Sequence, residues 1–120
     1  MSRLRILRQM ANQSAQLDLV FQGLADSTRR AVLERLSAGP APVKELASPF
    51  KMSLPSFTQH LGVLERAGLV SSDKAGRVRT FRIVPKRLEL VENWLEGQRA
   101  HWNKRLNQLD AYLVNVKEKK

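Results

Sequence analysis

The sequence predicts a mainly helical domain with one small β-hairpin and a long helix at each end. Two observations support this fold class. Apolar residues recur at helical spacing over most of the 120-residue chain, and this spacing gives way to strand-like alternation only between residues 69 and 84. A second long helical pattern follows Pro85 and continues to Val116. The length suits a single domain with elongated terminal helices.

The first half of the chain contains three expected helices. The first covers residues 7–24, where apolar side chains recur three and four positions apart. Asp26 is an expected N-cap because its side chain can accept the free amides of the following turn. The second helix therefore starts there and ends at Gly39-Pro40, which is a strong stop signal. A short third helix is expected over residues 43–48 and is closed by Pro49.

The fourth expected helix begins after Ser53, a second N-cap, and runs through Ala67 to a stop at Gly68. Phe57 is the centre of its core-facing stripe, and His60 lies beside this stripe, which favours a packed role for its ring. The opposite face lacks the usual mixture of Glu and Lys and carries Pro55, Thr58, Gln59, Gly62, Val63 and Arg66. Short polar groups of this kind suit the base edges of a DNA major groove.

Residues 69–84 then predict a two-stranded hairpin with its turn near Ala75-Gly76. The final expected helix covers about residues 86–116. Four helices, a hairpin and a last helix are the order of a winged helix-turn-helix, in which the fourth helix is the recognition helix and the hairpin is the wing. We expect one domain with a DNA-binding core and wing over residues 25–84, flanked by dimerisation helices over residues 1–24 and 85–120.

The charge of the chain favours a polyanionic partner. There are 21 Lys and Arg residues against 11 Asp and Glu residues, which gives a net charge of +10. Lys74, Arg77 and Arg79 surround the glycine turn of the hairpin, from which they can reach the minor groove of double-stranded DNA. The charge alone also fits a non-specific or architectural nucleic-acid-binding protein, or a winged helix that binds another protein.

The last helix is too long for the core of a small domain, since each residue adds about 1.5 Å of length. Its apolar stripe needs a partner, and a second copy of the chain is the simplest one. The residues expected at such a dimer interface are Leu17, Val20, Phe21, Val91, Leu95, Trp102, Leu109 and Tyr112. A homodimer would present two recognition helices about 34 Å apart to a pseudo-palindromic operator.

Other classes of protein lack support in the sequence. The chain has no cysteine, which excludes disulfides and thiol-based redox sensing. It has no apolar run long enough to span a membrane and no secretory signal pattern, so we expect a cytoplasmic protein without a membrane partner. His60 and His101 lie on different helices, and no phosphate-binding glycine loop is present. We therefore expect no enzyme activity, no cofactor and no metal site.

Two segments of the chain resemble the ArsR family of bacterial winged-helix regulators. The most specific parts are LADSTRRAVL, the pattern S-x-P-S-x-T-x-H-L at residues 53–61, and LERAGLV. The resemblance implies a homodimeric DNA-binding repressor, often of its own operon, that a metal, redox or small-molecule signal releases. It also implies that the DNA-reading residues are Ser53, Leu54, Ser56, Thr58, Gln59 and His60 on the recognition helix, with Arg77 and Arg79 on the wing.

The chain departs from the family pattern at several positions. Metal-sensing members carry paired cysteines near the positions of Ala47 and Ser48, and other members build a metal site from several His and acidic residues on the last helix. Here His101 has no neighbouring His, whereas zinc needs three or four convergent ligands. Lys51 replaces a common glycine, and Leu54 replaces a commonly polar residue. The sequence thus predicts a regulator whose inducer, if one exists, has unknown chemistry.

Overall fold

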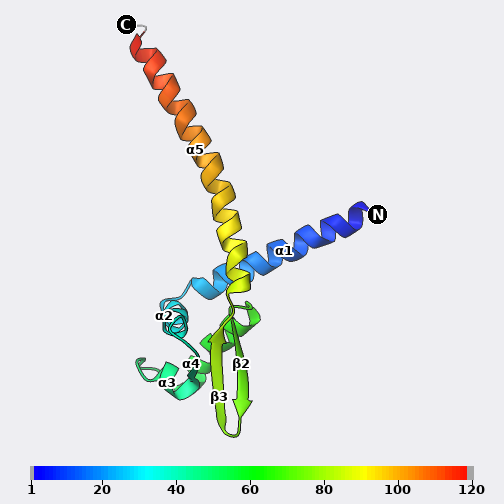
Figure 1. Ribbon diagram of the computed structural model, residues 1–120, viewed down its shortest axis with the longest axis vertical. Helices are drawn as coiled ribbons and strands as arrows, with labels where there is room; N and C mark the ends of the chain where they lie inside the picture. Colours follow the sequence, from blue (N-terminus) through cyan, green and yellow to red (C-terminus); the bar gives the residue numbers. More distant parts are fainter. Residues whose placement is uncertain (1, 119–120) are drawn as a thin grey trace.

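The computed structural model describes residues 2–118 and shows a small body from which two long helices project (Figure 1). The elements in order are α1 (Arg3–Leu24), α2 (Ser27–Leu36), β1 (Ala41–Pro42), α3 (Val43–Ala47), α4 (Leu54–Arg66), β2 (Val70–Ala75), β3 (Val78–Ile83), a 3₁₀ turn (Pro85–Arg87) and α5 (Leu88–Glu118). The radius of gyration is 20.9 Å, whereas a compact chain of this length would have about 14 Å. The excess reflects the projecting parts of α1 and α5.

The two predicted N-caps are confirmed. An Asp26 carboxylate oxygen accepts the Arg29 N–H at 3.1 Å, and the Ser53 hydroxyl oxygen accepts the Ser56 N–H at 3.3 Å. Gly68 ends α4 because its φ of +74° suits glycine, and the N–H of Leu69 returns to the carbonyl of Leu64 at 3.0 Å. These local signals determine where α2 begins and where α4 begins and ends.

The sheet has three antiparallel strands in the order β1-β3-β2. The predicted hairpin is present, with Lys74 opposite Arg79 and a turn at Gly76, whose φ is +63°. The prediction of two strands missed β1, where Ala41 pairs with Phe81. Two residues are too few to show strand alternation, so the sequence gives no signal for this strand.

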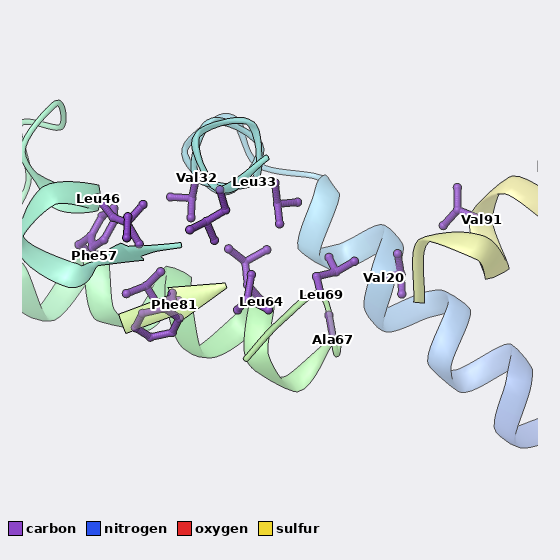
Figure 2. Packing of buried hydrophobic residues seen from close by; sticks show 14 residues of the cluster. Val20, Val32, Leu33, Leu46, Phe57, Leu64, Ala67, Leu69, Phe81 and Val91 are labelled. Atoms are coloured by element: carbon purple, nitrogen blue, oxygen red, sulfur yellow. The ribbon is translucent and has the colours of Figure 1, made fainter. Parts of the chain in front are cut away.

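The core joins all the helices to the sheet. In Figure 2 the labelled side chains extend from Leu46 and Phe57 at one end to Val20 and Val91 at the other, where α1 and α5 meet. Phe57 is fully buried, and so are the other predicted core positions of α4, Leu61 and Leu64. The predicted orientation of α4 is therefore confirmed, with its core stripe inward and its polar face outward.

Two of the residues predicted for a dimer interface belong instead to this core. Val20 has no exposed surface and Val91 is 8% exposed, because each is covered by side chains of its own chain. The prediction was wrong for both, since helical periodicity marks an apolar face without saying what covers it. Leu17 is half-buried against the same cluster. The ends of the terminal helices also differ, because α1 starts at Arg3 and α5 continues to Glu118.

Within residues 2–118 no helix is long and apolar enough to cross a membrane.

Candidate nucleic-acid interface

The outer face of α4 carries the side chains predicted to read DNA. Leu54, Thr58 and Gln59 are exposed, and they line a shallow groove of about 740 Å³ that continues past Gly62 to Arg66. At the start of the helix the Ser53 hydroxyl donates to the Ser56 hydroxyl oxygen at 3.0 Å. This face is thus open along its length and offers hydroxyl, amide and methyl groups to a partner.

Gly62 brings a cation close to the surface of α4. A Cβ atom at Gly62 would lie 3.3 Å from a guanidinium nitrogen of Arg66, so the Arg66 side chain lies across the glycine. A larger residue at position 62 would have to displace this guanidinium. The absence of a side chain at Gly62 thus leaves space on the outer face of α4, and the Arg66 guanidinium occupies it.

His60 differs from the other predicted reading residues because it faces back into the domain. Its Nδ1 lies 3.0 Å from Nη1 of Arg29 and 3.6 Å from Oδ2 of Asp26, and its side chain is 24% exposed. Arg29 can only donate, so Nδ1 accepts this hydrogen bond when it carries no proton. This geometry agrees with the packed role favoured by the position of His60, and Nδ1 is not free for a base while Arg29 holds it.

Arg29 connects three helices through its guanidinium. In addition to His60 of α4, it donates from Nε to the carbonyl of Gly23 at 3.0 Å and from Nη2 to the carbonyl of Gln22 at 2.9 Å. Both carbonyls lie in the last turn of α1, where helix carbonyls lack partners within the helix. One side chain of α2 therefore links the end of α1 to the recognition helix.

The hydrogen bond from the Arg29 N–H lowers the pKa of Asp26 below its usual value, and the positive charge of Arg29 acts in the same direction. Asp26 is consequently ionised at neutral pH. It both caps α2 and places a negative charge beside the ring of His60.

The wing presents its basic residues around the tip of the hairpin. Lys74 and Arg79 face one another across the two strands and Arg77 lies in the turn, all three being exposed. Arg79 donates from Nη1 to the hydroxyl of Ser72 at 2.8 Å, which orients its guanidinium. Arg82 forms an ion pair with Asp73 on the neighbouring strand.

Recognition helix and wing form one continuous surface. A hollow of about 300 Å³ is lined by Thr58, Gly62 and Arg66 of α4 together with Arg79 of β3. In Figure 1 the basic hairpin tip lies at the far end of the molecule from the C-terminus of α5.

The projecting helices carry an exposed apolar stripe. Phe21 of α1 meets Trp94 of α5 edge to face, with ring centroids 5.7 Å apart. Beyond this contact the exposed apolar residues of α5 include four predicted for the dimer, Leu95, Trp102, Leu109 and Tyr112. They also include Val116, where the predicted helical pattern ends, and two residues that the sequence reasoning missed, Leu106 and Leu113. A search for the 4-3 spacing from Trp102 onward would have found these two.

The part of the chain that the structure describes holds no group of three or more His, Cys, Asp or Glu side chains that could bind a metal ion.

The fold and this surface are those of a winged helix-turn-helix DNA-binding protein. Residues 24–73 match a model of a helix-turn-helix domain family. The chain is 43% identical to the HTH-type transcriptional regulator Rv2034 of Mycobacterium tuberculosis over 66% of this chain and 74% of the relative. It is 30% identical to the transcriptional repressor SdpR of Bacillus subtilis over 63% and 84% of the two chains.

A solved structure also relates this chain to a transcriptional regulator. A crystal structure of an ArsR-family transcriptional regulator has 52% sequence identity and a TM-score of 0.73, and the match covers 75% of this chain and 93% of that one. The chain belongs to the ArsR family of transcriptional regulators. It is therefore a DNA-binding regulator rather than an enzyme, and it is a member without cysteine.

Proposed function

We propose that the protein is a homodimeric, sequence-specific repressor that binds a pseudo-palindromic operator of its own or a neighbouring operon, in the cytoplasm where that DNA lies. The observation that carries the proposal is the continuous surface made by the outer face of α4 and the basic hairpin. One relative is named a repressor, which supports this direction of regulation.

In this proposal α4 lies in the major groove. Ser56, Thr58 and Gln59 read base edges there, and the amide of Gln59 suits adenine in particular. Ser53 and the free amides of the first turn bind a phosphate, because the positive end of the helix dipole is there. Leu54 is exposed beside them and can contact the methyl group of a thymine.

The wing supplies the electrostatic part of binding. Lys74, Arg77 and Arg79 lie against the phosphates or the minor groove, where a cation is favoured. Each phosphate that such a residue neutralises should steepen the log–log dependence of binding on salt by about 0.9. His60 supports DNA binding indirectly in this proposal. Its Nδ1 bonds to Arg29 and so helps to position α4, instead of contacting a base.

Dimerisation is proposed to use the residues 1–24 and 85–120 that flank the DNA-binding unit of residues 25–84. The exposed Phe21, Leu95, Trp102, Leu109 and Tyr112, with the half-buried Leu17 beside them, give two copies an apolar surface to share. Burying a side chain of this size stabilises a complex by about 1.5–3 kcal/mol. Several such contacts along the two helices would support a stable dimer.

The experiment is fluorescence anisotropy with labelled duplex from upstream of the protein's own gene and a scrambled duplex of the same length, each titrated across salt. A preference of about 10³-fold for the native duplex is expected of a specific regulator. Gln59→Ala should weaken binding to the native duplex far more than to the scrambled one. Gln108→Ala, the same change on exposed α5, is the matched control and should leave both unchanged.

Two results would refute the proposal. Equal binding to both duplexes, lost together as salt rises, would instead identify a non-specific nucleic-acid-binding protein, which the charge of +10 also fits. Equal effects of Gln59→Ala and Gln108→Ala would show that α4 does not read the sequence.

A further inference from the structure

An apolar groove of about 830 Å³ lies between α3, the turn that leads into α4, and the tip of the hairpin. Val43, Ala47 and Phe50 form its floor, and these three also pack against the core. Phe50 stacks on the fully buried Phe57 with ring centroids 5.5 Å apart. The floor is thus built into the fold, and its volume falls within the roughly 300–1,000 Å³ of typical small-molecule sites.

The walls of the groove are apolar and exposed. Leu54 at the start of α4 is 59% exposed, and Val78 at the start of β3 is 51% exposed. A DNA backbone is charged and hydrated, so it does not explain why an apolar surface of this size lies between two DNA-contacting elements. The groove instead has the character of a site for a molecule with an apolar body.

Three cations surround this apolar surface. Lys44, Arg77 and Arg79 line the groove, and none of its lining residues is acidic. Within residues 2–118 the side chains of Lys44 and Arg77 take part in no hydrogen bond or ion pair, so both charges can meet a ligand. Arg79 donates one hydrogen bond to Ser72, and its guanidinium has further N–H donors that can bind a ligand. A guanidinium at the rim favours a carboxylate or sulfonate.

We propose that this groove binds a small amphipathic organic anion, such as an aromatic or aliphatic carboxylic acid, and that this ligand excludes DNA. The exclusion rests on the proposed function, in which Leu54, Arg77 and Arg79 contact the duplex. Ligand and DNA then compete for the same side chains without any change of fold. At a ligand concentration of 100 times its Kd, the apparent affinity for DNA falls about 100-fold.

The test uses the full-length protein and the fluorescent anion 8-anilinonaphthalene-1-sulfonate. Val78→Glu removes part of the apolar wall and adds a repelling charge at an exposed position, so it should weaken dye binding at least about tenfold. Val114→Glu is the matched control, because Val114 is 54% exposed on α5, far from the groove. It should bind the dye as the unmodified protein does. Equal binding by the two variants would overturn the proposal.

The chemistry of the ligand is tested with displacers. The uncharged analogue N-phenyl-1-naphthylamine should bind at least about tenfold more weakly than the sulfonate if the cations matter, and equal binding would overturn their role. Decanoate and 1-naphthoate should displace the dye, and the stronger of the two shows whether the site prefers an aliphatic or an aromatic body. If neither displaces it, only the dye binds and the proposed ligand class is wrong.

Competition with DNA separates this proposal from the proposed function. Duplex DNA should release the bound dye, and 1-naphthoate should release labelled DNA. If Val78→Glu abolishes dye binding but DNA does not release the dye, the ligand site is supported. The proposal that DNA covers the same surface is then refuted. A different result is that the unmodified protein does not bind the dye while Val78→Glu changes the oligomeric mass. This pair of results would mean that a second copy of the chain covers the groove, and it would overturn the proposal.

Discussion

Replacement of Arg29 by methionine tests whether one guanidinium holds the recognition helix in place. The substitution keeps most of the side-chain length and removes three hydrogen bonds, to the carbonyls of Gln22 and Gly23 and to Nδ1 of His60. Such bonds contribute about 0.5–1.5 kcal/mol each. Because the site is only partly buried, water would replace some of them. We expect a loss of about 2 kcal/mol in the free energy of unfolding.

Arg30→Met is the matched control for this substitution. Arg30 is the next residue and also donates to a carbonyl at the end of α1, that of Leu24 at 2.7 Å, but this single bond is exposed to solvent. Its loss should cost no more than about 0.5 kcal/mol. The two variants therefore remove the same charge from the same helix turn, but Arg29→Met removes three hydrogen bonds, one of them to His60, whereas Arg30→Met removes one.

The assay is urea unfolding followed by circular dichroism, at one protein concentration because association would add to the measured stability. A fall in the unfolding midpoint for Arg29→Met, with little change for Arg30→Met, is the expected result. Equal falls would show that the loss comes from the positive charge alone, and the structural role assigned to Arg29 would then be wrong.

Three further outcomes are expected. Leu109→Glu should convert a dimer to monomers in light-scattering mass measurements. Asn107→Glu places the same charge on the other side of α5 and should leave the dimer intact. If both variants remain dimers, the proposed interface is refuted. Because the pKa of Asp26 is lowered, its cap stabilises α2 above about pH 4 and is lost as the pH falls below the folded-state pKa. Asp26→Asn, which keeps a capping oxygen without a titrating group, should flatten this acid loss in unfolding experiments, and an unchanged pH profile would contradict the assignment. Arg77→Ala should reduce the salt slope of DNA binding by about 0.9, and Arg82→Ala, which removes a paired cation, should reduce it less; equal slopes would contradict this distinction.

Local signals explain which parts of the fold could be predicted from the sequence. The caps at Asp26 and Ser53, the stop at Gly68 and the turn at Gly76 each depend on a few neighbouring residues, and all four are found where they were expected. The core stripe of α4 around Phe57 follows from helical periodicity in the same way. Short-range physical chemistry is visible in sequence because its causes are adjacent in the chain.

Features that depend on long-range packing could not be predicted. Val20 and Val91 have the same spacing as residues that remain exposed, and only the contact between α1 and α5 decides that they are buried. The contact of Arg29 with His60 joins residues 31 positions apart and leaves no periodic pattern. The apolar groove brings α3 and the hairpin together across a similar distance in the chain. In each case the cause lies in the tertiary structure.

The placement of Arg29 has a consequence for how such a dimer would read DNA. The spacing of two recognition helices depends on how α4 is held relative to α1 and α5, since these two helices would form the interface. The Gly23 backbone packs so closely that a Cβ there would lie 2.9 Å from Leu69, just beyond the end of α4. Arg29 adds hydrogen bonds from the end of α1 to His60 within α4. The last turn of α1 therefore contacts the recognition helix in two ways, by close packing and by hydrogen bonds, so we expect a shift of α1 in the proposed dimer to move the proposed DNA-reading face with it.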